Sequence, residues 1–471
     1  MAAHRNLLPR TTPAAAGVSS RAIVKLLDEL AAEGVECHSL MIVRRGQVVA
    51  EGWWAPYSAD RPHLVYSLTK SFSSVAVGLA VADGLLSLDD RVVDVLPDHL
   101  PADLPDQARR LTVQHLLTMT AGHATDSLAG AWELEPGDLI KGFLRGPFEY
   151  AEGTRHTYDN STTFVLARMV ERVTGRGLPE LLDERLFHPM GIHTVEWDRV
   201  ASGAAFGFHG LHLTTEAVAA FGELLLRGGR WGDRRLVPRE WLELATRRHI
   251  ETLPLPNWRP NPDFLWGYGY QFWMSRHGFH GHGAYGQYCV VVPSHDVVIA
   301  MTASNEQESA LPGLLWDCVL PGLDHPDSAQ DDEVLAERLR QLSFKPVKGS
   351  ADRHGRVTAK IGADSALPDG TAVSLDPVDG GWLLRLGTSI ELPVGHGQWR
   401  ESSPLGRPMV AAGGWQGERF IAELFVITSP HRVRLVIAAG EATARWNTEP
   451  LTTQNLELHL RAPLMTRPDV S

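Results

Sequence analysis

The stretch Tyr66-Ser67-Leu68-Thr69-Lys70-Ser71-Phe72 decides the fold of this 471-residue chain. Six of the 44 basic residues are lysines, and among these Lys70 alone has a serine three positions before it. If the stretch opens a helix, positions i and i+3 share one face, so the Ser67 hydroxyl and the Lys70 amine can meet. Arginine keeps its proton in proteins, whereas a buried lysine can lose it. Ser67 and Lys70 therefore have the minimum geometry of an activated nucleophile, with a chance S-x-x-K as the alternative.

A second segment supplies a proton carrier. Tyr158-Asp159-Asn160 is the only Tyr-x-Asn among the eight tyrosines, and it lies between a turn at 152–153 and an amphipathic helix from Phe164. A tyrosine beside Lys70 can take the serine proton and return it to a leaving group, provided that the ammonium lowers its pKa. Asn160 can hold Lys70 or a substrate carbonyl. The alternative is a buried tyrosine in an ordinary turn.

The third segment is Gly281-His282-Gly283-Ala284, which leads into an apolar strand at 288–292. Glycines in a strand allow a substrate to approach the backbone closely. The N–H groups of Ser67 and Ala284 can then form an oxyanion hole. At a helix start, Ser67 also gains from free N–H groups and from the positive end of the helix dipole. A plain glycine-rich turn is the alternative.

In this order the motifs S-x-x-K, Y-x-N and x-x-G resemble the serine β-lactamase and penicillin-binding-protein superfamily, above all its class C branch and related esterases and amide hydrolases. The segments 85–90, 111–123 and 189–192, which lie between these motifs, also look like those of that family. The resemblance covers roughly residues 7–320. The resemblance implies an α+β fold, with a β-lactamase/transpeptidase-like antiparallel sheet flanked by helices and a helical subdomain. It also implies an acyl-enzyme on Ser67, with Lys70 and Tyr158 handling the proton, and no metal or organic cofactor.

One departure from the family pattern bears on the substrate. Where β-lactamases and penicillin-binding proteins usually carry Lys-Thr-Gly, this chain reads Gly281-His282-Gly283. The missing cation is the one expected to hold a carboxylate, and His280 or His282 would replace it only weakly. We therefore expect a hydrolase of carboxylic esters or small amides, similar to the esterases and 6-aminohexanoate-dimer hydrolases. The alternatives are a β-lactamase or D-amino-acid peptidase, and a non-catalytic ligand sensor.

The rest of the chain predicts two domains. Apolar hairpins at 39–53 and 288–301 are expected to pair in one antiparallel sheet covered by helices, within a hydrolase domain at 1–330. Ser20 is expected to cap the first helix, and an acidic connector is expected to lead into a short helix near 333–342. Alternating segments at 345–471 predict an antiparallel β domain, a sandwich or barrel, in which no catalytic constellation stands out.

Composition excludes several classes of protein. An apolar content of 44% and a charged content of 21% are those of a globular protein, and a net charge of −12 argues against nucleic acid or a membrane surface as partner. Three scattered cysteines and a start without an apolar run predict a cytoplasmic protein with a small-molecule substrate. The pairs His280/His282 and His209/His212 lack further ligands at suitable spacing, so no metal site is expected.

Overall fold

A six-stranded sheet forms the centre of the N-terminal part. The computed structural model describes residues 6–254, 262–306, 311–351 and 355–463. The strand order is β2-β1-β11-β10-β9-β8, and all neighbours are antiparallel. The bounds are β1 (Glu36–Arg44), β2 (Gln47–Trp53), β8 (Trp273–Ser275), β9 (Gly278–Gly283), β10 (Gln287–Val292) and β11 (Val297–Ser304). The predicted pairing of the early and late hairpins is confirmed, since Ile42 of β1 lies opposite Ile299 of β11.

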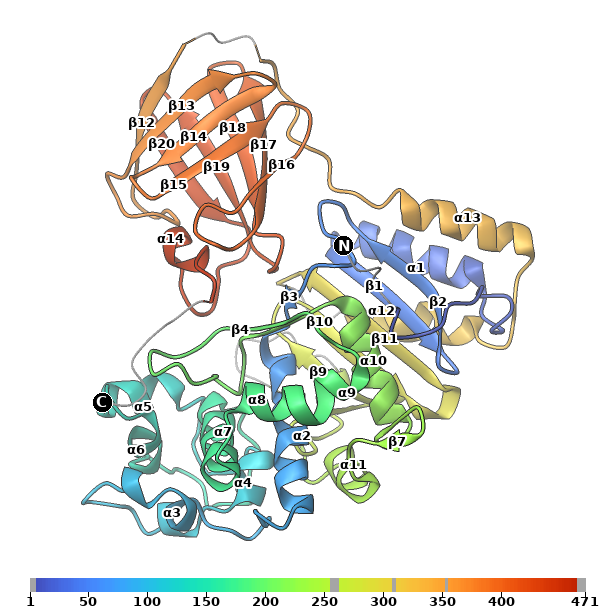
Figure 1. The fold of residues 1–471 in the computed structure, drawn as a ribbon, viewed down its shortest axis with the longest axis vertical. Helices are drawn as coiled ribbons and strands as arrows, with labels where there is room; N and C mark the ends of the chain where they lie inside the picture. Colours follow the sequence, from blue (N-terminus) through green and yellow to red (C-terminus); the bar gives the residue numbers. More distant parts are fainter. Residues whose placement is uncertain (1–5, 255–261, 307–310, 352–354, 464–471) are drawn as a thin grey trace.

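Helices cover both faces of this sheet (Figure 1). Successive residues of β1 point to opposite sides, so Leu40 and Ile42 enter one core and Met41 and Val43 the other. On the first side lie α1 (Ser20–Ala32), α12 (Leu311–Cys318) and α13 (Ala329–Arg340), and on the second lies α10 (Thr215–Leu226). Two helix starts differ from expectation: Ser19, not Ser20, caps α1, and α13 begins earlier than 333 because Ser328 and Asp331 form a capping box.

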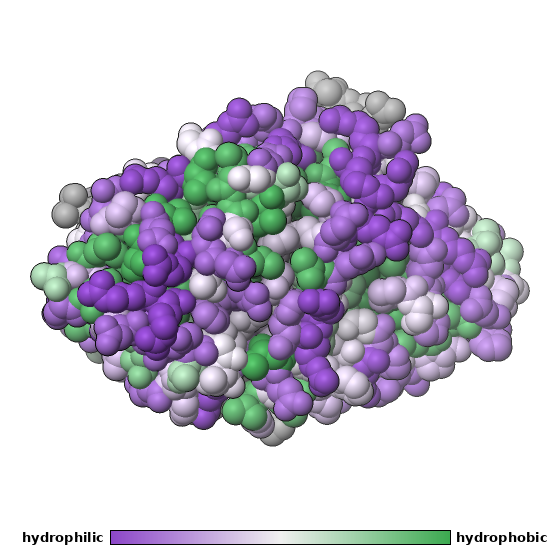
Figure 2. Space-filling view, turned by 90° about the horizontal axis from the view of Figure 1, so that it is seen from below, coloured by the Kyte–Doolittle hydropathy of each residue, from purple (hydrophilic) through white to green (hydrophobic). Residues whose placement is uncertain are grey.

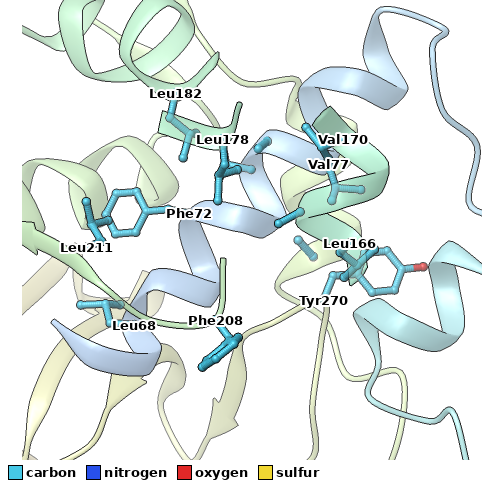
Figure 3. Packing of buried hydrophobic residues seen from close by; sticks show 14 of the residues in the cluster. Leu68, Phe72, Val77, Leu166, Val170, Leu178, Leu182, Phe208, Leu211 and Tyr270 are labelled. Atoms are coloured by element: carbon cyan, nitrogen blue, oxygen red, sulfur yellow. The ribbon is translucent and has the colours of Figure 1, made fainter. Parts of the chain in front are cut away.

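A group of helices packs beside α2 (Thr69–Ala82), which carries Lys70. Phe72 and Val77 of α2 meet Leu166 and Val170 of α7 (Asn160–Thr174) in one apolar core (Figure 3). This packing fixes the start of α2 against the start of α7. The other helices here are α3 (Val92–Val95), α4 (Val113–Leu117), α5 (Leu128–Leu134), α6 (Leu139–Leu144), α8 (Leu178–Leu182), α9 (His188–Met190) and α11 (Arg239–Ala245).

The C-terminal strands form a closed barrel, which decides between the sandwich and barrel alternatives (Figure 1). Buried and exposed residues alternate along β14 and β19, as in a sheet with a packed interior. A parallel contact between β15 and β17 closes the ring. The bounds are β12 (Val357–Ile361), β13 (Ala372–Val378), β14 (Gly381–Leu386), β15 (Ile390–Gly395), β16 (Arg400–Ser402), β17 (Met409–Gln416), β18 (Arg419–Phe425), β19 (Arg432–Ala438) and β20 (Glu441–Trp446), followed by α14 (Leu456–His459).

One end of the barrel is seated on the N-terminal part. The turn between β18 and β19 reaches a small sheet, where the Leu64 N–H donates to the Thr428 carbonyl at 2.8 Å. Arg407 and Asp198, both almost fully buried, form an ion pair of 2.6 Å across the contact. The small sheets are β3 (His63–Leu64), β4 (Val195–Trp197) and β5 (Leu211–Leu213), and β6 (Arg230–Trp231) with β7 (Arg234–Arg235).

The outer surface is mixed. Seen from below, one face is covered mostly by hydrophilic residues with hydrophobic patches between them (Figure 2). Within the described ranges, no helix combines the length and apolar character that crossing a membrane requires.

Candidate active site

The predicted nucleophile lies on a short 3₁₀ turn, η1 (Tyr66–Leu68), that runs directly into α2. Ser67 is partly exposed, whereas Lys70 is 2% exposed. Tyr66 has a left-handed backbone with φ of 47°, which a non-glycine residue seldom adopts, so the turn that presents Ser67 is strained. Strain of this kind persists only where surrounding contacts hold it.

Lys70 makes three hydrogen bonds, one for each N–H of its ammonium. Its Nζ donates to Ser67 Oγ at 2.9 Å, to Asn160 Oδ1 at 2.7 Å and to the Phe208 carbonyl at 3.0 Å. The i, i+3 spacing on one helix face and the start of α7 bring Ser67, Lys70 and Asn160 together, as the sequence indicated, whereas the Phe208 carbonyl was not expected. A neutral lysine at this position would keep two donors and offer its lone pair to the serine.

The electrostatics around Lys70 favour that neutral form. Burial lowers the pKa of Lys70 to about 7, although the carboxylates of Asp126 and Asp159 act in the opposite direction. Near neutral pH, a substantial fraction of the amine is therefore unprotonated and able to accept a proton.

Asn160 is oriented by a residue that the sequence did not single out. Its side-chain N–H donates to Asp126 Oδ2 at 2.6 Å, and its backbone N–H donates to Asp126 Oδ1 at 3.0 Å. These bonds turn the amide oxygen of Asn160 toward Lys70. Asp126 is thus a positioning residue behind the amine.

Asp159 completes the support from α7. It is the N-cap of the helix and accepts hydrogen bonds from the backbone and hydroxyl of Ser127 and from the Ser161 N–H. Burial and the neighbouring Asp126 carboxylate raise the pKa of Asp159 well above its usual value. The start of α7, and with it Asn160, is fixed by this network.

Tyr158 lies beside the same amine. Lys70 Nζ is 4.8 Å from the centre of the Tyr158 ring, and the ring stacks on Trp273 of β8. The predicted proximity of Tyr158 to Lys70 is therefore present. Its role as a proton carrier stays a prediction.

The glycines of β9 act differently from the expectation that they admit a substrate. A Cβ on Gly283 would lie 2.0 Å from the Val65 carbonyl oxygen, and one on Gly281 would lie 2.3 Å from Leu68. The glycines thus let β9 pack against η1. Because β8 pairs with β9 only as far as His280, the segment 281–283 forms the sheet edge that faces the nucleophile turn.

Ala284 follows this edge in the turn between β9 and β10. Tyr285 after it has a left-handed φ of 69°, and the chain returns at Gln287, which pairs with Gly283. The close contact of β9 with η1 places the start of this turn beside the segment that carries Ser67. An oxyanion hole made by these two N–H groups remains a prediction.

His280 does not replace the missing cation. It is fully buried, burial lowers its pKa to about 3, and neither ring nitrogen has a hydrogen-bond partner among the described residues. His282 is also buried and packs on Phe264 and Tyr288. In the described part of the chain, no three His, Cys, Asp or Glu side chains converge as metal ligands would.

Replacing Gly283 by Ala is expected to lower kcat/KM by about 10²-fold, the usual effect of losing one oxyanion donor. The added methyl would lie 2.0 Å from the Val65 carbonyl oxygen, so β9 must shift, and the predicted oxyanion donor at Ala284 shifts with it. Steady-state kinetics should be compared with Gly313→Ala on α12, where an added Cβ has no neighbour within 4 Å. Wild-type activity in Gly283→Ala would contradict the proposed part of β9 in the site.

The family follows from comparison with known proteins. The family model described as Beta-lactamase matches residues 22–315, which include Ser67, Lys70, Tyr158 and 281–284. The chain belongs to the beta-lactamase family. It is therefore a serine hydrolase of that family, as expected from the motifs. The C-terminal barrel lies outside the matched residues.

Individual relatives agree with this assignment. The chain is 31% identical to the lovastatin esterase of Penicillium rubens over 160 residues, 29% of this chain and 40% of the esterase. It is 27% identical to the 6-aminohexanoate-dimer hydrolase of Paenarthrobacter ureafaciens over 252 residues, 49% of this chain and 63% of the hydrolase. The chain thus spans less than two thirds of either relative.

A solved structure shares the fold of this beta-lactamase-family chain. EstCE1, described as a hydrolase with promiscuous acyltransferase activity, superposes with a TM-score of 0.52 at 16% identity. The superposition covers 64% of this chain and 98% of EstCE1.

Proposed function

We propose that this serine hydrolase cleaves carboxylic esters or small amides through an acyl-enzyme on Ser67. Neutral Lys70 takes the proton as Ser67 Oγ attacks the carbonyl carbon, and the N–H groups of Ser67 and Ala284 hold the oxyanion. When the intermediate collapses, the bond to the leaving group breaks, Tyr158 donates its phenolic proton to that group, and Lys70 gives the proton taken from Ser67 to Tyr158. Water then cleaves the acyl ester, releasing the acid and restoring Ser67.

The observation that carries this proposal is the 2.9 Å hydrogen bond between a buried lysine and a partly exposed serine. A structural lysine would be solvated or paired with a carboxylate, whereas Lys70 bonds a hydroxyl, an amide oxygen and a carbonyl. This arrangement also disfavours a non-catalytic sensor, which has no need of a lysine whose pKa is near 7.

The expected substrate class follows from the absence of a lysine in the segment 281–283, where a cation would hold a carboxylate. The two glycines carry no charge, the buried His280 has a lowered pKa, and a histidine such as His282 replaces a lysine only weakly, whereas the carboxylate of a β-lactam or a D-peptide needs a cation. Uncharged esters and short amides need no such partner. A β-lactamase or D-peptidase is therefore the second candidate, supported by the family and by a curated relative described as a putative D-alanyl-D-alanine carboxypeptidase.

The proposal is tested by incubating the protein with p-nitrophenyl esters, p-nitroanilides, nitrocefin and D-alanyl peptides, and weighing the intact protein during turnover. We expect a mass increase equal to the acyl group with esters, and slow or no turnover of nitrocefin. Fast nitrocefin or D-alanyl turnover would support the second candidate instead, and inertness to the whole panel would favour a sensor.

The pH dependence of kcat/KM should follow the Lys70 amine. Because the deprotonated amine is the active form and its pKa is about 7, activity should rise about tenfold per pH unit below 7 and level off above it. Asp126→Asn removes a charge that raises the pKa of Lys70, so it should move this rise to lower pH. An activity that is flat from pH 5 to 9 in a buffer series at constant ionic strength would rule out Lys70 as the base.

A further inference from the structure

The C-terminal barrel, in which sequence patterns indicated no catalytic role, touches the immediate surroundings of the nucleophile. The Tyr66 hydroxyl and His431 Nε2 are 2.6 Å apart, and Tyr66 is the strained residue directly before Ser67. His431 Nδ1 lies 2.9 Å from the Thr448 carbonyl, so this nitrogen carries the proton and Nε2 accepts from Tyr66. The barrel therefore fixes the side chain next to the nucleophile.

The segment after β20, residues 447–452, continues this contact along the site. The Tyr285 hydroxyl donates to the Glu449 carbonyl at 2.6 Å, and Tyr285 is the residue after Ala284. Thr452 Oγ1 lies 3.2 Å from His209 Nε2, and His209 follows Phe208, whose carbonyl binds Lys70. The backbone of Leu451 also lies close to the Tyr66 hydroxyl.

Leu451 stands out within this segment. Glu449 and Thr452, on either side of it, are held by Tyr285 and His209, yet 67% of Leu451 is exposed, the largest fraction among the described large apolar residues. A single exposed leucine is common on protein surfaces, so its exposure alone assigns no role. Leu451 differs from other exposed leucines because the residues beside it contact Tyr285 and His209, which follow Ala284 and Phe208 directly.

The contacts of this segment also indicate which part of a substrate it would meet. Tyr158, the proposed donor to the leaving group, stacks on Trp273, whereas the barrel segment contacts Tyr66, Tyr285 and His209. A leaving group departs toward the residue that protonates it, so the acyl chain extends away from Tyr158.

We propose that residues 447–452 of the C-terminal barrel form one wall of the substrate cleft, and that Leu451 binds the apolar acyl chain of the substrate. The proposal rests on the proposed function and extends it to a substrate class: esters and amides of apolar acids with more than a few carbons. The barrel thereby sets specificity for chemistry performed on another part of the chain.

The kinetic test compares Leu451→Ala with wild type on p-nitrophenyl acetate, butyrate and octanoate. We expect kcat/KM for the octanoate to fall about tenfold relative to the acetate, since a leucine-sized contact is lost only for the long chain. Val378→Ala is the matched control, because Val378 is also an exposed apolar residue of the barrel. It ends β13, which runs in the opposite direction to β12 and β20. Val378 therefore lies at the end of the barrel opposite to residues 447–452, which follow β20. An octanoate-to-acetate ratio unchanged within twofold in Leu451→Ala would overturn the proposal.

A second measurement does not depend on hydrolysis. All three native cysteines are buried, so the double variant Ser67→Cys/Leu451→Cys has two accessible thiols of known position. Treatment with bismaleimidoethane should give one reagent bridging both thiols, identified by peptide mass, whereas Ser67→Cys/Val378→Cys should take up two separate reagents. If wild type hydrolyses no ester, the proposed function fails and the acyl-binding role of Leu451 fails with it, whereas the bridge still tests whether Leu451 lies at Ser67; absence of the bridge would overturn the placement of residues 447–452 at the cleft.

Discussion

Ser67→Ala is expected to abolish covalent labelling by a fluorophosphonate probe and to lower kcat/KM by about 10⁴-fold or more, because the acyl-enzyme can no longer form. The loss should appear in kcat, and the melting temperature should change little because Ser67 is partly exposed and, among the described residues, its hydroxyl is hydrogen-bonded to Lys70 alone. The label should be located on the peptide that contains Ser67 in wild type.

Ser74→Ala provides the matched control for this loss. Ser74 lies on the same helix, is fully buried, and its hydroxyl has no hydrogen-bond partner among the described residues. Its removal should leave both labelling and kcat/KM near wild type. A protein that is still labelled and active after Ser67→Ala would not use the mechanism proposed here.

Lys70→Arg is expected to reduce kcat/KM by about 10³-fold although the positive charge is retained. An arginine cannot lose its proton at neutral pH, so it can neither accept the serine proton nor offer a lone pair. Three acceptors fix the position of the amine, and the larger guanidinium must also displace one of them. Stopped-flow measurement of acylation should show the loss in the first step.

Two comparisons separate this chemical effect from damage to the fold. Lys25→Arg on the exposed face of α1 should leave activity unchanged. Ser67→Ala/Lys70→Arg should be no less active than Ser67→Ala, because groups that act as a unit are not additive. Retention of most of the wild-type kcat in Lys70→Arg would refute the role of Lys70 as the base.

Local patterns in the sequence were sufficient for the centre of the site. The i, i+3 spacing of Ser67 and Lys70 and the position of Asn160 at a helix start are short-range features, and the structure has them within hydrogen-bonding distance. The hairpins were also predictable, because successive residues of a strand point to opposite faces of the sheet. A run of consecutive apolar residues therefore indicates a strand that is buried on both faces, between two cores.

The remaining contacts depend on segments that have no signature of their own. The Phe208 carbonyl binds Lys70 through its backbone, which any residue type would supply. Asp126 follows a recognisable turn at 121–123. That turn is the feature of the sequence from which a role for Asp126 near the site could have been predicted. The sequence predicts that Gly283 lets a substrate approach the backbone. In the structure the space beside Gly283 is filled by the carbonyl of Val65, which lies more than 200 residues away in sequence.

The pairing of β1 with β11 also has a consequence for biosynthesis. Ile42 leaves the ribosome more than 250 residues before Ile299, its partner in the sheet. At 5–20 residues per second this interval lasts roughly 15–50 s, during which one long edge of an apolar hairpin has no strand beside it. The yield of folded protein should therefore depend on chaperones that shelter the nascent hairpin until its partner is translated.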